Sequence, residues 1–256
     1  MNILLTNDDG IYAPGLWALE KQFSKNHKVA IVAPDRERSA VGHGITLHDP
    51  LRASKVSVNG SWGYAVNGKP ADCIKIAVLE LLDFKPDMVI SGINPGANIG
   101  ASINYSGTVA AAKEAALYGL LSMAVSIQSF DIESYDEAAC FTEKLSQDVY
   151  KRGLPFGTLL NVNLPDLPLD KIQGISISRQ GVKKFSREYY EKRIDPRKKN
   201  YHWLGMDMRS YGRDLEIDGD ALAQNYISIT PIKCDMTDYA IMEDIKSWDI
   251  QKKFKC

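Results

Sequence analysis

Met1–Gly10, which reads MNILLTNDDG, is the stretch that decides the fold class of this chain. Its apolar part, residues 3–6, is typical of a short buried β-strand. Asp8 and Asp9 follow that strand directly, in a turn-like sequence that ends at Gly10. Because ligands bind at the carboxyl edge of a parallel α/β sheet, the decapeptide predicts two carboxylates at a binding edge.

Strand-like and helix-like segments alternate through the first two thirds of the chain. The expected strands lie at residues 29–33, 88–91, 123–127 and 159–162, and the expected helices at residues 16–23, 71–82, 108–118 and 135–152. The strands are continuous apolar runs rather than alternating ones, which indicates a parallel sheet covered on both faces. We therefore expect an α/β protein with a doubly wound, mostly parallel sheet.

The character of the sequence changes after about residue 175. Residues 179–199 contain nine Lys and Arg against three acidic residues, a local charge of +6 (9 − 3), and several aromatic residues lie within and just after this run. The segment is open to three interpretations: a solvated charged face, an oligomerisation arm, or a basic wall for an anionic substrate. A strand at 226–230, stopped by Pro231, and a closing helix at 238–248 are expected to follow.

These patterns predict a division of the chain into two parts. We expect residues 1–175 to form an α/β catalytic core. We expect residues 176–256 to form an extension, made of a hairpin arm, a returning strand and a closing helix, that packs on the core and on a partner subunit. Closed homo-oligomers, most often two-fold, are the common way to cover such a segment, so a homo-oligomer is expected.

Charge and cysteine usage exclude several classes of protein. The chain has 31 Lys and Arg against 32 Asp and Glu, and this net charge of −1 gives no general attraction to nucleic acid or to a membrane surface. Its four cysteines, at 73, 140, 234 and 256, have no metal-finger spacing and suit reduced thiols. No apolar run is long enough to span a membrane. We expect a cytoplasmic protein that binds neither nucleic acid nor membrane.

The pair Asp8-Asp9 predicts a metal site. Two adjacent carboxylates repel each other unless a positive charge lies between them, and oxygen ligands suit Mg²⁺ or Mn²⁺. The alternative is that the pair simply belongs to a turn, because Asp and Gly both favour turns. Two further polar loops, residues 34–46 and 92–100, each follow an expected parallel strand. Three such loops converging on one edge favour the metal site over the plain turn.

A phosphate site is predicted at the start of the alanine-rich helix. Ser106, Gly107 and Thr108 open that helix, whose first N–H groups and positive dipole end suit an anion. A plain N-cap at Ser106 or Thr108 is the alternative. A different phosphate motif is excluded: residues 63–69 fit GxxxxGK, but Pro70 cannot supply the hydroxyl that a P-loop needs and instead suits the first turn of a helix.

Six segments give this chain a resemblance to a known family. MNILLTNDDGIYAPG (residues 1–15) and APDRERSAVGHGIT (33–46) resemble the SurE, or survival protein E, nucleotidase family, and so do SGINPGANIG (91–100) and YSGTVAAAKEA (105–115). DPRKKNYHWLG (195–205) and NYISITPIKCDMTDY (225–239) are similar to later segments of that family. The resemblance runs from residue 1 to about residue 240, which is nearly the whole chain.

The resemblance implies a Rossmann-like core, a C-terminal extension used in dimer or tetramer assembly, and a metal-dependent phosphatase that acts on nucleoside monophosphates. Carried over to matching positions, the ligands of one divalent cation per subunit, Mg²⁺ or Mn²⁺, would be Asp8, Asp9, Ser39 and Asn94. Residues expected to line the phosphate would be Asn98, Ser106, Gly107 and Thr108.

The sequence departs from the family pattern at two positions. Lys198 stands where many relatives have a glycine, and Tyr239 stands where a histidine is often found. If that histidine assists proton transfer in relatives, this chain does without it or uses His43, a residue of the second polar loop. A loop histidine that only forms hydrogen bonds is the alternative for His43.

The function expected from the sequence is metal-dependent hydrolysis of nucleoside 5′-monophosphates to nucleoside and phosphate, with Asp8 or Asp9 orienting or deprotonating the attacking water. Action on 3′-monophosphates and on polyphosphate is left open. The alternative is a nucleotide-binding regulatory module with no turnover. The Asp8-Asp9 pair argues against that alternative, because carboxylates beside a phosphate repel it unless a cation lies between them.

Overall fold

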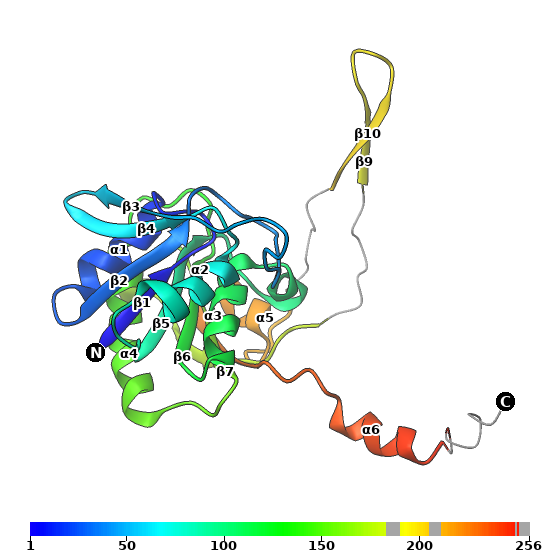
Figure 1. Cartoon of the computed structure of the whole chain (residues 1–256). Helices are drawn as coiled ribbons and strands as arrows, with labels where there is room; N and C mark the ends of the chain where they lie inside the picture. Colours follow the sequence, from blue (N-terminus) through cyan, green and yellow to red (C-terminus); the bar gives the residue numbers. More distant parts are fainter. Residues whose placement is uncertain (183–189, 205–210, 249, 251–256) are drawn as a thin grey trace.

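The computed structural model describes residues 1–182, 190–204, 211–248 and 250. Its body is a nine-stranded sheet in the order β3-β4-β2-β1-β5-β6-β7-β11-β8, and β9 and β10 form a separate two-stranded sheet (Figure 1). The strands of the large sheet are β1 (Asn2–Thr6), β2 (Lys28–Pro34), β3 (Ala53–Val58), β4 (Ser61–Val66), β5 (Met88–Pro95), β6 (Leu121–Ile127), β7 (Thr158–Leu164), β8 (Gly174–Ile177) and β11 (Tyr226–Lys233).

The sheet is mostly parallel, as the sequence predicted. All neighbours from β4 through β2, β1, β5 and β6 to β7 run parallel, whereas β3 is antiparallel to β4, and β11 is antiparallel to β7. From β1 the chain goes to β2 on one side of it and later returns to β5 on the other side. The carboxyl end of β1 is therefore a topological switch point, where α/β sheets bind ligands.

Helices cover both faces of the sheet. The described helices are α1 (Pro14–Phe23), α2 (Pro70–Ile76), α3 (Gly107–Leu117), α4 (Asp136–Arg152), α5 (Asp218–Ala223) and α6 (Tyr239–Lys246), of which α6 lies away from the sheet. Short helical segments lie at Ala77–Leu81, Gly100–Asn104 and Leu169–Lys171. The pair α1 and α4 packs together on one face, and the pair α2 and α3 packs together on the other. The result is the three-layer, doubly wound α/β architecture expected from the sequence.

The central strands are buried on both faces, which explains their continuous apolar sequences. Ile3, Leu4 and Leu5 of β1 are fully buried. Ile3 and Leu5 belong to the core beneath α1 and α4, whereas Leu4 belongs to the core beneath α2 and α3. Burial of each such side chain contributes about 1.5–3 kcal/mol. Alternate residues of one strand thus hold the helices of both outer layers.

The hairpin of β3 and β4 was not expected from the sequence. The residues of β3 are a mixture of exposed and half-buried ones, so β3 lacks the continuous apolar run of a central strand. β4 pairs in parallel with β2 and ends at Val66, shortly before Pro70 starts α2. Pro70 thus takes the first turn of a helix, as predicted. The helix expected at 71–82 is found as two segments: α2 ends at Ile76, and a π-helical turn covers Ala77–Leu81.

The prediction that Pro231 stops its strand is wrong. β11 continues to Lys233, and Pro231 pairs with Leu160 of β7. The carbonyl of Ile229 accepts a hydrogen bond from Ser178 N at 2.9 Å, so alternate residues of β11 present their backbone groups to the β8 side. β8 pairs with β11 only as far as Ile229. The missing N–H of Pro231 therefore faces a side where β11 has no partner strand, and no ladder bond is lost.

Some residues after 175 belong to the large sheet, and others form elements that stand away from the body. The boundary expected between residues 175 and 176 falls inside β8, and β11 joins the same sheet, so the division into core and extension stays a prediction. The antiparallel strands β9 (Tyr190–Ile194) and β10 (Asn200–Leu204) form an exposed hairpin, and α6 stands off the body (Figure 1). Residues 183–189 of the basic segment, and Cys256, lie outside the described residues.

One departure from the family pattern, Lys198, lies in the turn of the β9–β10 hairpin. Lys198 has a φ of +63°, in the left-handed region that favours glycine. Asp195 O accepts a hydrogen bond from Lys198 N at 2.9 Å, and Asp195 N donates to Lys199 O at 2.9 Å. A glycine takes this conformation without strain, which is a physical reason for the glycine that the resemblance carries there.

In the part of the chain that the structure describes, no helix is both long and apolar enough to cross a membrane.

Candidate metal and phosphate site

The turn after β1 holds the two carboxylates at the switch point. Asn7 is buried and closes the turn with its side chain, because Nδ2 donates to Gly10 O at 2.9 Å and Oδ1 accepts from Gly10 N at 3.2 Å. Gly10 has a φ of +100°, and a Cβ there would lie 2.9 Å from the backbone carbon of Arg36. Only glycine fits this position, so the sequence NDDG fixes the direction of Asp8 and Asp9.

The start of α3 lies directly against Asp8. Thr108 Oγ1 donates a hydrogen bond to Asp8 Oδ1 at 2.5 Å, and the backbone N–H groups of Gly107 and Thr108 also face this carboxylate. A Cβ at Gly107 would lie 2.7 Å from Asp8 Cβ, so a side chain there would push the helix away. The positive end of the helix therefore stabilises the Asp8 carboxylate, and Gly107 permits the approach.

The pKa values of Asp8 and Asp9 are both raised above the ordinary value of an aspartate. Burial raises the pKa of Asp8, although the hydrogen bonds from Thr108 and the amides of α3 act in the opposite direction. Burial, together with repulsion from Asp8 and Glu37, raises the pKa of Asp9 to about 7. Asp9 Oδ2 is buried and has no hydrogen-bond partner. An orphaned carboxylate oxygen beside a second carboxylate fits a cation.

Asn94 comes to the same edge from β5, the neighbour of β1. Its Nδ2 donates to the carbonyls of Pro95 at 3.1 Å and Gly96 at 2.7 Å. Both bonds use the amide nitrogen, so they orient the side chain and leave Oδ1 out of these contacts. A neutral amide oxygen is a suitable ligand for a hard cation.

Ser39 lies in the loop after β2, and that loop is fastened to the turn of Asp8. Arg38 N donates to Asp8 O at 2.7 Å, which places the residues around Arg38 against the carboxylate turn. Ser39 itself is exposed, and its Oγ donates to Glu37 Oε1 at 2.5 Å. The structure thus brings the loop to the site, with the Ser39 hydroxyl engaged by Glu37.

The residues expected to line the phosphate are all buried, but their hydroxyl and amide groups have partners. Ser106 Oγ accepts from Val109 N at 3.1 Å, so it is the N-cap of α3, which was the alternative interpretation. Asn98 Nδ2 donates to Ser126 Oγ at 2.9 Å, and Asn98 O accepts from Asn161 and Asn163. The phosphate-lining role of Asn98, Ser106, Gly107 and Thr108 stays a prediction.

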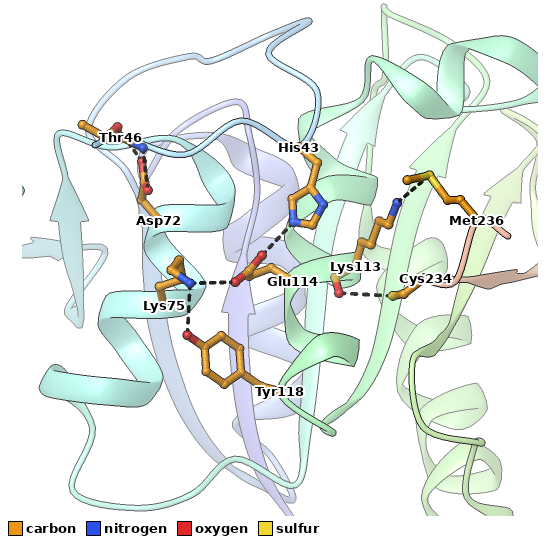
Figure 2. Close-up of polar contacts among 9 residues, drawn as sticks. All are labelled: His43, Thr46, Asp72, Lys75, Lys113, Glu114, Tyr118, Cys234 and Met236. Atoms are coloured by element: carbon orange, nitrogen blue, oxygen red, sulfur yellow. Dashed lines mark hydrogen bonds and ion pairs between the residues drawn. The ribbon is translucent and has the colours of Figure 1, made fainter. Parts of the chain in front are cut away.

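His43 points toward the second turn of α3 (Figure 2). Its Nε2 lies 2.7 Å from Glu114 Oε2, and Glu114 Oε1 accepts from Lys75 Nζ at 3.2 Å. The hydrogen bond from His43 lowers the pKa of Glu114, with a further contribution from Lys75, although burial acts the other way. The alternative given for His43, a loop histidine held by hydrogen bonds, describes what the structure shows.

Tyr239 is at the start of α6, where its hydroxyl donates to Asp235. Before that helix, the chain after β11 runs along α3: Cys234 Sγ lies 3.6 Å from Lys113 O, and Lys113 Nζ lies 3.7 Å from Met236 Sδ (Figure 2). These contacts tie residues 234–236 to α3, and the helix that carries Tyr239 stands off the body (Figure 1).

Sequence reasoning missed two acids near the site. Glu37 hydrogen-bonds Ser39 and raises the pKa of Asp9, and the buried Glu114 holds His43. Glu37 gave a signal of its own, since it lies two residues before Ser39 in the same polar loop. Glu114 gave none, because a single acid in an alanine-rich helix is typical of a solvated face.

The donor set at the site is oxygen-only. Across residues 1–182, 190–204, 211–248 and 250 there is no group of three or more His, Cys, Asp and Glu placed to hold a metal. The expected ligand set contains only two such residues, Asp8 and Asp9, and is completed by a hydroxyl and an amide. Such a set fits Mg²⁺ or Mn²⁺ better than Zn²⁺, which favours nitrogen and sulfur ligands.

Comparison with known proteins gives one consistent family for the chain. The family model "Survival protein SurE" matches residues 3–187. Two proteins named 5′-nucleotidase SurE, from Desulfatibacillum aliphaticivorans and Syntrophobacter fumaroxidans, are 51% and 49% identical, and each alignment covers 98% of this chain and 100% of the relative. The crystal structure of the SurE protein from Aquifex aeolicus superimposes with a TM-score of 0.84 at 36% identity, over 96% of this chain and 99% of that one.

The family model spans most of the chain, relatives match it from end to end, and the solved fold is the same. The resemblance seen in the sequence is thereby confirmed, and the chain belongs to the SurE family.

Proposed function

We propose that this chain is a 5′-nucleotidase, which hydrolyses nucleoside 5′-monophosphates to nucleoside and phosphate. The observation that carries the proposal is the Asp8-Asp9 pair at the switch point, packed against the N-terminal end of α3, with Asp9 Oδ2 buried and unpartnered. The relatives that match the whole chain are named 5′-nucleotidases, which favours turnover over the non-catalytic nucleotide-binding module.

One divalent cation, Mg²⁺ or Mn²⁺, completes the proposed site. Asp8, Asp9, Ser39 and Asn94 would hold it, and the orphaned Asp9 oxygen together with the oxygen-only donor set supports this assignment. When bound, the cation supplies Lewis acidity, which neutralises charge on the phosphoryl group and makes water more acidic.

The chain's own residues position the reactants and move a proton. Asp8 or Asp9 would orient the attacking water or accept its proton. Thr108 and the first amides of α3 hold Asp8 in place as its partner. The positive end of α3 lowers the cost of bringing a phosphate beside two carboxylates, and Asn98, Ser106, Gly107 and Thr108 line that position.

The experiment that tests the proposal is phosphate release from a panel of nucleoside 5′- and 3′-monophosphates and polyphosphate. We expect turnover of 5′-monophosphates with Mg²⁺ or Mn²⁺, its loss in EDTA, and its return when metal is added. Asp9→Asn should weaken metal binding as well as turnover. Full activity in excess EDTA, with no metal found by elemental analysis, would exclude the metal-dependent mechanism.

We also propose that the protein is a homodimer or homotetramer in the cytoplasm. The oligomer is supported by the apolar side chains that the β9–β10 hairpin and α6 leave exposed on a single chain, among them Ile194, Trp203 and Ile241. The cytoplasmic location is supported by the thiols of residues 73, 140 and 234, each of which is free.

A further inference from the structure

A long loop without helix or strand joins β2 to β3 and carries Ser39. It spans residues 35–52, which is longer than most connections in compact domains. Loops of this length that keep one conformation need anchors, and long ordered loops are commonly functional. The position of Ser39 relative to Asp8 and Asp9 therefore depends on what fastens this loop.

Anchors lie on both sides of Ser39. Before it, Arg38 N donates to Asp8 O at 2.7 Å; after it, Gly42 N donates to Tyr105 O at 2.9 Å. His43 adds a side-chain anchor, since Nε2 donates to Glu114 Oε2 at 2.7 Å. Only three residues separate Arg38 from Gly42, so these anchors set where the Ser39 hydroxyl lies.

Glu114 is the group that makes the side-chain anchor firm. It is 7% exposed, and each of its two carboxylate oxygens has its own partner, His43 from the loop and Lys75 from α2 (Figure 2). Lys75 also lies 3.2 Å from Tyr118 OH, so the far side of the carboxylate is fixed to α2 and α3. A buried acid with one oxygen fixed to the body presents the other to the loop at a defined position.

We propose that Glu114 is a positioning residue for the cation site: through His43 it holds the loop of residues 35–52 on α3, and so keeps Ser39 beside Asp8 and Asp9. This rests on the proposed function, because it takes Ser39 as a ligand. Glu114 and His43 are not ligands in this proposal. They hold the loop that carries a ligand, and groups that orient ligands in this way change the affinity of a protein for its metal.

The chain offers a graded variant and a matched control. Lys75→Met removes the α2 partner of Glu114 and leaves the contact to His43. Thr46→Val removes a second side-chain anchor of the same loop, in which Thr46 Oγ1 donates to Asp72 Oδ2 at 2.6 Å, farther along the chain from Ser39. Thr46→Val should change stability without changing the position of Ser39. Lys75→Met should loosen the contact between Glu114 and His43, and so weaken Mn²⁺ binding less than Glu114→Ala does.

The test measures Mn²⁺ affinity of the full chain by titration, and amide hydrogen exchange of residues 39–45 without metal. In His43→Ala and Glu114→Ala we expect the Mn²⁺ dissociation constant to rise about tenfold or more and the loop amides to exchange faster. The double variant should be no worse than either single one. Turnover at saturating Mn²⁺ should return to the parent value, and Glu114→Gln, which keeps a hydrogen-bonding oxygen, should restore part of the affinity.

Three results would overturn the proposal. One is an unchanged Mn²⁺ affinity in His43→Ala and Glu114→Ala while Asp9→Asn weakens binding, which leaves the proposed function standing. Another is lost turnover at saturating Mn²⁺ with normal affinity, which assigns His43 to the chemistry itself. The third is Asp9→Asn with parental Mn²⁺ affinity, which removes the proposed metal site along with its positioning residue. His43 lies in a loop, so its variant keeps the test valid if Glu114→Ala does not fold.

Discussion

Asp9 shows how much a single residue sets the conditions under which this site works. Its pKa is raised to about 7 by burial and by the charges of Asp8 and Glu37. An ionised Asp9 is therefore destabilising in the metal-free chain near neutral pH, and a cation bound at the proposed site would relieve that cost. The same carboxyl thus lowers the stability of the metal-free fold and, in the site that we propose, binds the divalent ion.

The metal-free protein should lose stability as the pH rises toward neutrality. The unfolded chain releases the Asp9 proton near the ordinary value of 3.8, whereas the folded chain releases it at about 7. Between these values the folded state binds more protons, so the free energy of unfolding falls as the pH increases and levels off above 7. Urea unfolding in EDTA at pH 5 and pH 8 measures this decline.

Asp9→Asn is the control for that measurement, because an amide does not titrate. The variant should show a smaller decline between pH 5 and pH 8 than the parent. Asp8, whose pKa is also raised, accounts for any decline that remains. A parent whose stability is equal at the two pH values, or a variant that declines as steeply as the parent, would contradict the assignment of a raised pKa to Asp9.

At the scale of elements, the N-terminal end of α3 has two hydroxyls with separate tasks. Ser106 caps the helix by accepting from Val109 N, and Thr108 donates to Asp8 at 2.5 Å. The two residues lie one turn or less apart, yet one contact is internal to the helix and the other reaches the site. Beyond the phosphate-lining position proposed for both, their substitutions should therefore affect different quantities.

Thr108→Val should reduce catalysis, whereas Ser106→Ala should reduce stability. Loss of a hydrogen bond to a charged group costs about 1.5–3 kcal/mol, which is roughly a 10- to 150-fold loss of kcat/KM for Thr108→Val. Loss of an N-cap costs about 0.5–2 kcal/mol of the free energy of unfolding. Kinetics and urea unfolding of both variants measure the two effects. A Thr108→Val enzyme with parental kcat/KM would show that its contact to Asp8 is not used in turnover.

The elements that sequence alone predicted are those with the strongest burial. β1, β5 and β6 are continuous apolar runs because both of their faces are covered, and their order along the chain predicted the doubly wound sheet. β3 was missed because it lies at the edge of the sheet, where polar residues interrupt its apolar ones. The end of β11 was wrong because the cost of Pro231 depends on which side of the strand lacks a partner, and that is a property of the finished sheet.

The candidate site divides in the same way. The positions of Asp8, Asp9 and Asn94 at the carboxyl edge of the sheet were predictable, because Asp8 and Asp9 follow a buried strand and Asn94 lies at the end of one. Glu114 was not, because its role depends on a loop histidine 71 positions away in sequence. Local pattern thus identifies groups that the strands carry to the edge, and it misses the groups that hold those strands' loops in place.

At the scale of the whole molecule, the exposed hairpin and α6 determine the assembly that we propose. Ile194 and Trp203 of the hairpin, and Tyr239, Ile241 and Ile245 of α6, are each more than one third exposed in the single chain. Exposed aromatic and aliphatic side chains of this kind are typical of subunit interfaces. An oligomer would cover them and would account for two elements that pack little on their own body.

Removal of residues 235–256 should reduce the oligomer or cause aggregation. This truncation takes away α6 and leaves all of β11 in the sheet, because β11 ends at Lys233. Light scattering should give at least a dimer for the full chain and a smaller or heterogeneous mass for the truncated one. A full-length chain that is a clean monomer at micromolar concentration would contradict the proposed assembly.

The place of β11 in the sheet also governs how the protein is made. Among the described residues, β8 pairs only with β11. β11 lies between β8 and β7, although about 48 residues separate the end of β8 from the start of β11. A ribosome adds roughly 5–20 residues per second, so a nascent chain waits several seconds with the edge of β7 open and β8 without a neighbour. Fragments released in that interval would carry an open sheet edge, which can pair with other chains and aggregate.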